Sequence, residues 1–159
     1  MSTTKQVLTL RIEGDLFALP VTQVQEILDL APLLRVPHWP DHLLGVVDVR
    51  GTGMAVIDLR RLLGLPPRPD DAATRLVVLR LDSPQGPLGL ALKTERVLEV
   101  TDLDAPGPDP LPATGLSRDQ SRFVASLGRR DGQLVALLDL QRMFDAETLR
   151  EARNPRAAA

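Results

Sequence analysis

One stretch of the chain, GVVDVRGTGMAVIDLR at residues 45–60, decides the fold. Two apolar runs, Leu43–Val49 and Met54–Leu59, flank the short segment Arg50–Gly53, whose two glycines favour a tight turn. Because β-branched and aliphatic residues fit a pleated, half-buried surface, both runs favour strands. The stretch therefore predicts a β-hairpin, followed by one helical turn over Arg60–Leu65.

Similar short runs lie on both sides of this hairpin. Val7–Ile12 alternates apolar and polar residues, as a half-buried strand does, and the adjoining Glu13-Gly14-Asp15 favours a turn. Further strands are predicted at Leu16–Leu19, Leu76–Leu81, Leu90–Leu92, Phe123–Leu127 and Leu134–Leu138. The sequence is therefore expected to fold mainly into β-structure.

Helical and irregular segments are few. Apolar residues at helical spacing over 21–28, after Pro20, predict one helical turn followed by extended chain. A last amphipathic stretch, Leu140–Arg150, predicts a helix. Pro66–Ala73, rich in proline and polar residues, is predicted to be a linker.

The chain repeats itself. Three matched pairs of segments occur in the same order in both halves, which is typical of a duplicated unit rather than of chance likeness between strands. The pairs are Leu10–Ile12 with Leu79–Leu81 (offset 69), Phe17–Ile27 with Leu90–Val100 (offset 73), and Gly51–Leu59 with Gly132–Leu140 (offset 81). The growing offset indicates loop insertions in the second copy.

A small closed barrel is the simplest fold for such a unit, because it pairs the edge strands and surrounds a core. We expect an all-β protein with two five-stranded barrels side by side and an aliphatic groove between them. Residues 5–150 are expected to form one domain, with 5–66 as the first barrel, 74–145 as the second, and strand exchange between them left open. Residues 151–159 are expected to be disordered.

Composition excludes several classes of protein. Lysine and arginine (19) are scattered and nearly balanced by aspartate and glutamate (21), so no basic stripe for nucleic acid is present. The absence of cysteine excludes disulfides and thiolate catalysis. The sequence has neither a signal peptide nor a membrane-length apolar run, which predicts a cytoplasmic protein without membrane insertion.

The quoted stretch resembles the CheW-type coupling proteins of bacterial chemosensory arrays. It is similar to the family's Gly-Val-x-Asn-Leu-Arg-Gly and Pro-x-x-Asp-Leu-Arg segments, with Asp48 in place of Asn and Ala55 in place of Pro. The other matches are Phe17–Ile27, Ala91–Val100, where Ala91, Thr94 and Glu95 replace the family's Gly, Val and Asp, and Leu137–Phe144. The resemblance covers roughly residues 5–145.

The resemblance implies a fold of two intertwined SH3-like five-stranded barrels. It also implies a non-enzymatic scaffold that couples chemoreceptor cytoplasmic tips to the regulatory domain of a CheA-type histidine kinase, recruited to membrane-associated receptor arrays. The positions matching the receptor groove are Val24, Glu26, Ile27, Arg50 and Val97. The substitutions at Asp48 and Ala55 are expected near that groove, where they would affect the choice of partner.

Simpler roles compete with binding for two of these residues. Arg50 is either a turn residue that pairs with Asp48 or an interface arginine, a type enriched at binding hot spots. Glu26 is either a surface residue paired with Arg35 or a contact residue. The presence of Glu99 at the equivalent position of the repeat favours a structural role for Glu26.

Asp58 and Asp139, which are equivalent in the repeat, are predicted to cap the helical turns that follow them.

No catalytic residue, cofactor or metal site is predicted. His38 and His42 are four residues apart, but the prolines around them argue against a shared helix face. The alternatives to the coupling scaffold are a diverged CheW-like paralogue that binds a receptor or another partner without a standard CheA kinase, as in a pilus or gliding pathway, and a small enzyme or ligand-binding barrel.

Overall fold

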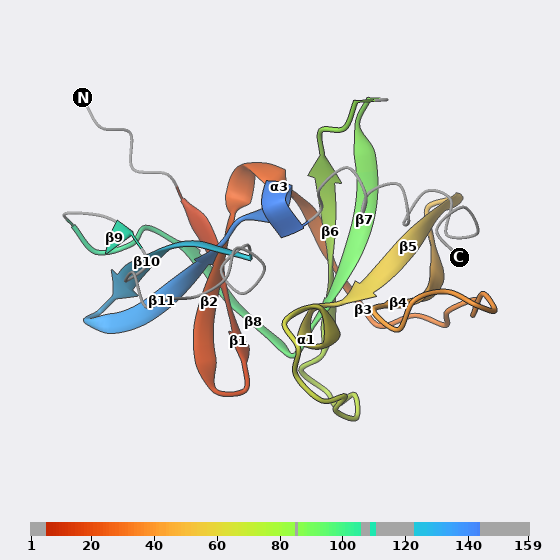
Figure 1. Cartoon of the computed structure of the whole chain (residues 1–159), viewed down its shortest axis with the longest axis horizontal. Coiled ribbons are helices and arrows are strands. Elements are labelled where there is room, and N and C mark those ends of the chain that lie inside the picture. Colours follow the sequence, from red (N-terminus) through yellow and green to blue (C-terminus); the bar gives the residue numbers. More distant parts are fainter. Residues whose placement is uncertain (1–5, 85, 106–108, 111–122, 144–159) are drawn as a thin grey trace.

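The computed structural model describes residues 6–84, 86–105, 109–110 and 123–143, whose strands form two sheets lying side by side (Figure 1). The strands are β1 (Val7–Ile12), β2 (Asp15–Pro20), β3 (Val24–Asp29), β4 (Leu43–Val49), β5 (Thr52–Asp58), β6 (Arg75–Leu81), β7 (Leu88–Thr94), β8 (Arg96–Thr101), β9 (Asp109–Pro110), β10 (Val124–Arg130) and β11 (Gln133–Leu138). The short helices of the described residues are η1 (Val21–Gln23), α1 (Leu59–Leu62) and α3 (Leu140–Met143).

Each sheet combines strands from both copies of the repeat. The first sheet has the order β8-β1-β2-β11-β10-β9, and the second has the order β3-β6-β7-β5-β4. The first hairpin of each copy therefore pairs with strands of the other copy. The sheets therefore do not follow the division into residues 5–66 and 74–145, because strands are exchanged between the two copies, a possibility that the sequence left open.

The duplication is confirmed by the strand order. Strands that are equivalent in the repeat occupy the same place in the two sheets. Strand β8 of the first sheet corresponds to β3 of the second, β1 to β6, β2 to β7, β11 to β5 and β10 to β4. The two-residue β9 has no counterpart in the second sheet. Both sheets also hold one parallel pair, β2 with β11 and β5 with β7. The fold is the predicted double barrel.

Three hairpins turn on the same two-residue device. The turn residues are Glu13-Gly14, Arg50-Gly51 and Asp131-Gly132, with φ of 51–54° at the first position and 82–84° at the second. Positive φ at both positions matches the twist of the flanking strands, and glycine accepts it without steric cost. Arg50 thus projects from the tip of a tight hairpin.

The buried side chains form one shared core and two smaller ones. One cluster of sixteen buried residues draws on both sheets and includes Leu10 and Ile57, both 0% exposed. A second cluster, around Val56 and Ala91, is confined to the second sheet, and a third, around Ala18 and Val135, to the first. Successive residues of β5, such as Val56 and Ile57, lie in different clusters because side chains alternate along a strand. The shared cluster joins the two barrels.

Three segments show how the predicted elements compare with the structure. Residues 21–28 form a 3-10 turn only at Val21–Gln23, because the chain then extends as β3 and pairs with β6. Strand β8 was not predicted, since its apolar residues are flanked by charges and lie partly at the surface. The predicted helix Leu140–Arg150 is described only over α3, and its remainder lies outside the described residues.

Candidate partner-binding surface

Glu26 and Arg50 meet in a two-pronged ion pair. Glu26 lies on the half-buried face of β3, and Arg50 lies at the β4–β5 turn. Each guanidinium Nη of Arg50 is 2.9 Å from a different carboxylate oxygen of Glu26. The side chain of Glu26 is 17% exposed, whereas that of Arg50 is 78% exposed. A planar guanidinium held in this way is fixed in orientation and accessible to a partner.

The sequence suggested other partners for both groups. Glu26 pairs with Arg50 and not with Arg35. Asp48 does not pair with Arg50, because its Oδ1 accepts the backbone N–H of Gly51 at 2.8 Å and closes the turn. The hydrogen bond between Asp48 and Gly51 therefore fixes the backbone of the turn around Arg50, and the ion pair with Glu26 on β3 fixes the Arg50 side chain.

This ion pair also closes a barrel. Strands β3 and β4 lie at opposite edges of the second sheet. Since Glu26 is on β3 and Arg50 follows β4, their contact shows that the two edges curl toward one another. The barrel formed by the first sheet, called the first barrel from here on, has an equivalent pair. In this pair Nε of Arg130, at the end of β10, lies 3.5 Å from Oε1 of Glu99 on edge strand β8.

The apolar candidates fall into two groups. Val24 on β3 and Val97 on β8, which are equivalent in the repeat, are half-buried and pack against the shared core. Ile27 is 42% exposed on the outer face of β3. Four of the five candidates are thus gathered on the second barrel, while Val97 is paired with Leu10 in the first sheet.

The structure adds three residues to this set. Val100, the repeat partner of Ile27, is 49% exposed on β8, and Leu98 beside it is 38% exposed. Arg130, the partner of Glu99, is the third. In the sequence, the repeat offset of 73 relates Glu26 to Glu99 and Ile27 to Val100. The offset of 81 relates Arg50 to Asp131, although the residue that takes the place of Arg50 in the structure is Arg130, one position earlier.

Of the departures from the family pattern, only Asp48 is exposed. Ala55, which was expected near the groove, is 8% exposed and belongs to the shared core, so its side chain offers a partner little surface. Ala91 and Thr94 are also buried. The side chain of Glu95 is 14% exposed and bonds to arginines at the junction of the barrels.

The two aspartates proposed as caps occupy equivalent positions. Asp58 is the N-terminal flanking residue of α1, and its Oδ1 accepts the backbone N–H of Arg60 at 3.1 Å. Asp139 directly precedes α3, and its Oδ1 accepts the N–H of Arg142 at 3.0 Å. Both carboxylates therefore satisfy an N–H group that the short helix leaves unpaired.

The β10–β11 turn is fastened by a third carboxylate. Asp104 accepts the backbone N–H groups of Gly132 at 2.9 Å and Asp131 at 3.0 Å. These two bonds, the one from Gly132 first, hold the pKa of Asp104 below its ordinary value because they favour the charged form. The turn that carries Arg130 is thereby tied to the segment after β8.

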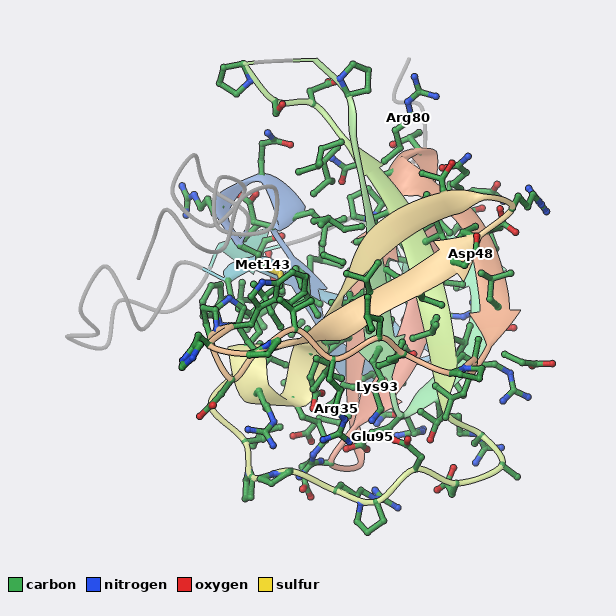
Figure 2. All side chains as sticks on the ribbon, turned by 90° about the vertical axis from the view of Figure 1, so that its right-hand side faces the viewer. Arg35, Asp48, Arg80, Lys93, Glu95 and Met143 are labelled. Atoms are coloured by element: carbon green, nitrogen blue, oxygen red, sulfur yellow. The ribbon has the colours of Figure 1, made fainter. Side chains whose placement is uncertain are left out.

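A cavity of about 570 Å³ opens at one end of the second barrel, lined by the β3–β4 loop, β4 and α1. Trp39 forms part of its wall and packs against the shared core. Its polar rim includes Arg35 and Lys93, which Figure 2 shows at the same end of the molecule. The carboxylate of Asp70 is paired with Lys93.

Among the described residues, no helix is long and apolar enough to span a membrane. The same part of the chain holds no group of three or more His, Cys, Asp or Glu side chains placed to bind a metal.

A solved structure shares this architecture. The scaffolding protein TtCheW from Thermoanaerobacter tengcongensis superimposes with a TM-score of 0.78 at 20% sequence identity, covering 92% of this chain and 96% of that one. The likeness extends over the whole double barrel, so this fold is that of a CheW-type scaffold.

The model of the CheW-like domain matches residues 6–148, and the chain therefore belongs to the CheW-like domain family. The probable chemotaxis protein CheW of Rhizobium etli is 29% identical over 149 residues, covering 93% of this chain and 92% of the relative. The chemotaxis protein CheW of Helicobacter pylori is 29% identical over 129 residues, covering 80% and 74%. Family and fold point to a non-catalytic adaptor.

Proposed function

We propose that this protein is a non-enzymatic chemosensory scaffold that couples the cytoplasmic tips of chemoreceptors to the regulatory domain of a CheA-type histidine kinase. The observation that carries the proposal is the pair Glu26–Arg50. It presents a fixed, exposed guanidinium, and the exposed Ile27 follows Glu26 in β3; these positions match the family's receptor surface. Arginine and apolar side chains together are typical of binding hot spots.

The partner at this surface is a helical hairpin, the form of a receptor tip. An apolar stripe of a helix fits against Ile27 and the half-buried Val24 and Val97, and a polar residue on its flank bonds to Arg50. The scaffold catalyses nothing. It holds receptor and kinase in a fixed relation, so that a small receptor movement shifts the on/off population of the kinase. Its place is then the cytoplasmic face of a receptor array.

Substitution of Arg50 by glutamate tests this surface. Because Arg50 is mostly exposed, Arg50→Glu should change the free energy of unfolding by no more than about 1 kcal/mol. The Kd for a receptor cytoplasmic fragment, measured by isothermal titration calorimetry, should rise roughly tenfold or more. Arg129→Glu makes the same charge change at an exposed position of the other barrel and should leave the Kd unchanged.

The double variant Glu26→Arg, Arg50→Glu separates barrel closure from binding. It restores an ion pair of opposite orientation, so the melting temperature should return to that of the wild type while binding stays weak. Recovery of binding would mean that the pair acts only through the fold. Failure of the wild-type protein to bind any receptor tip or CheA-type kinase from the same cell would contradict the proposal as a whole.

A second candidate rests on Asp48. This residue adds a carboxylate two residues from Arg50, where the family pattern has a neutral amide, and it is exposed. The chain is then a diverged CheW-like paralogue, of a pilus or gliding pathway, that binds a receptor without coupling a standard kinase. Binding of a receptor fragment without binding of the kinase regulatory domain identifies this case.

A further inference from the structure

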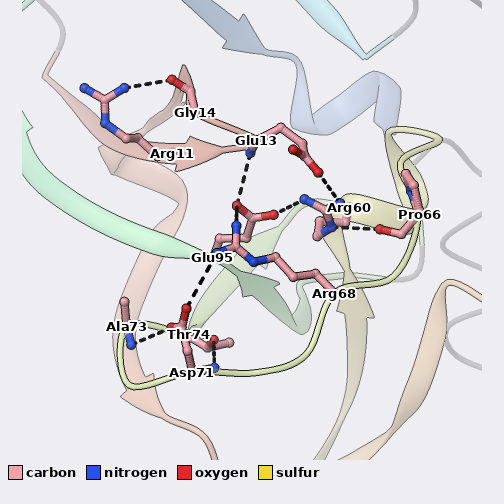
Figure 3. Close-up of polar contacts among 10 residues, drawn as sticks. All are labelled: Arg11, Glu13, Gly14, Arg60, Pro66, Arg68, Asp71, Ala73, Thr74 and Glu95. Atoms are coloured by element: carbon pink, nitrogen blue, oxygen red, sulfur yellow. Dashed lines mark hydrogen bonds and ion pairs between the residues drawn. The ribbon is translucent and has the colours of Figure 1, made fainter.

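A partly buried ionic cluster lies where the two barrels meet. Its centre is Arg60 on α1, which is 5% exposed. Figure 3 shows the guanidinium bonding in three directions: Nη1 to the carboxylate of Glu95, Nη2 to that of Glu13, and Nε to the carbonyl oxygen of Pro66 at 2.8 Å. Arginine stays charged at all ordinary pH, and its planar donors fix the directions of the acceptors.

The three charged residues come from different parts of the fold. Arg60 follows β5 of the second sheet, and Glu13 is in the β1–β2 turn of the first sheet. Glu95 stands where the chain passes from β7 in the second sheet to β8 in the first. The cluster therefore ties a hairpin tip of one barrel to a helix of the other and to the strand that crosses between them.

Further bonds hold the cluster together. Oε2 of Glu95 accepts the backbone N–H of Glu13 at 3.1 Å and Nη1 of Arg68 at 3.2 Å. The hydrogen bond with Glu13 is the main cause that raises the pKa of Arg60 above its ordinary value; burial acts against it, and Glu95 adds to it. The link between the barrels is thus charged and multiply bonded, with Arg60 and Glu95 largely buried and the Glu13 side chain 48% exposed.

The described residues of the pseudo-equivalent joint on the other side form no ion pair. The repeat offsets carry Arg60 to Gln141, Glu13 to Asp82 and Glu95 to Thr22. There Nε2 of Gln141 donates one hydrogen bond, of 3.1 Å, to the carbonyl oxygen of Asp82. Figure 1 shows α1 and α3, which carry these two joints, at opposite ends of the boundary between the barrels.

We propose that Arg60, Glu13 and Glu95 are positioning residues that fix the orientation of one barrel relative to the other at the α1 end. Strand β8 starts one residue after Glu95, and Val97 lies two residues after it. The cluster thus sets how β8 stands relative to β3. Its consequence for receptor affinity rests on the function proposed above, whereas its effect on barrel orientation does not.

Distance measurement between the barrels tests the proposal directly. The chain has no cysteine, so Arg80→Cys on β6 and Gln133→Cys on β11, both exposed, place one spin label on each sheet without competing sites. The distance distribution is recorded by double electron–electron resonance for the labelled full-length protein, first with the cluster intact.

Glu13→Asn is the main variant. Glu13 has a φ of 54°, which asparagine tolerates better than glutamate, so the substitution spares the turn while it removes the carboxylate that reaches Arg60. The distribution should broaden, its width rising roughly twofold if one anchor of the joint is lost. Asp15→Asn changes the same charge two residues away, where no ion pair is made among the described residues, and Gln141→Ala removes the hydrogen bond to Asp82 at the α3 end. Both should leave the width unchanged or nearly so.

A second variant removes the cluster without leaving an unpaired charge: Glu13→Asn, Arg60→Met, Glu95→Gln. It should broaden the distribution at least as much as Glu13→Asn alone. If both variants give the wild-type distribution while remaining folded by circular dichroism, the cluster does not position the barrels. Should the triple variant fail to fold, the result for Glu13→Asn decides.

Binding provides the second readout. The Kd of Glu13→Asn for the receptor fragment should rise roughly fivefold, although Glu13 is not among the residues proposed to touch the receptor. An unchanged Kd together with a broadened distribution would limit the cluster to barrel geometry and overturn its part in binding. If the wild-type protein binds no receptor, the proposed function fails, and the distance measurement still decides the positioning role.

Discussion

Replacement of Gly45 by alanine tests how the β3–β4 loop is packed over the second barrel. Gly45 lies in β4 with a φ of 151°, a backbone conformation that L-residues rarely adopt. A Cβ at this position would lie 2.4 Å from the carbonyl oxygen of Leu34. That carbonyl cannot simply move away, because Leu34 and Val46 exchange two backbone hydrogen bonds of 2.9 and 2.8 Å.

The cost follows from these contacts. A sparsely populated backbone conformation costs about 1–3 kcal/mol, and a forced overlap in a packed region costs a similar amount. If the loop moves to relieve the overlap, two hydrogen bonds worth about 1 kcal/mol each are lost instead. Gly45→Ala should therefore lower the free energy of unfolding by about 3 kcal/mol. For a chain of this length the melting temperature should fall by about 6–12 °C.

Differential scanning calorimetry and urea unfolding measure the effect. The matched control is Gly53→Ala in the neighbouring strand, whose Cβ would meet only Cγ1 of Val46, at 3.2 Å, without positive φ. This control should cost less than about 1 kcal/mol. Equal losses for Gly45→Ala and Gly53→Ala would refute the reasoning, since they would mean that the loop does not press on β4 at Gly45.

Two further predictions concern carboxylates that hold backbone N–H groups. Asp58→Ala should lower the free energy of unfolding by about 1 kcal/mol through loss of the bond to the N–H of Arg60, and Asp58→Ser, which keeps an acceptor, should recover most of it in urea titrations. Asp104 has a lowered pKa in the folded state, so its stabilisation is present above the ordinary carboxyl pKa of about 4 and is lost as the pH falls through the lower folded pKa. The urea midpoint of Asp104→Asn should therefore fall less steeply with decreasing pH than that of the wild type below about pH 4. Parallel plots of the midpoint against pH for the two proteins would contradict this account.

The sequence did not predict how the second barrel closes, and the Glu26–Arg50 pair shows why. The two residues are 24 positions apart, and each had a nearer candidate partner in the sequence. Which charge meets which depends on how far the sheet curls before β3 and β4 face each other. Curling results from the twist accumulated over all the strands and from the packing of the core, and no local pattern records it.

The local pattern of the sequence determined most of the strands. Side chains alternate between the two faces of a strand, so runs such as Val7–Ile12 and Leu43–Val49 reveal themselves without their partners. The in-order repeat was equally visible, and with it the duplicated fold, because both copies keep the same apolar spacing. The exposed strand β8 was missed for the same reason, since its charges obscure the alternation.

Only the tertiary structure decided which strands pair and which charges meet. The first hairpin of each copy joins the other copy's strands, and this exchange leaves no trace in either copy alone, because a strand edge offers the same hydrogen-bonding groups whichever chain segment fills it. The exchange also brings Glu13, Arg60 and Glu95 together from three distant segments. A buried arginine is tolerable only when such acceptors converge on it, and their convergence is a property of the folded chain.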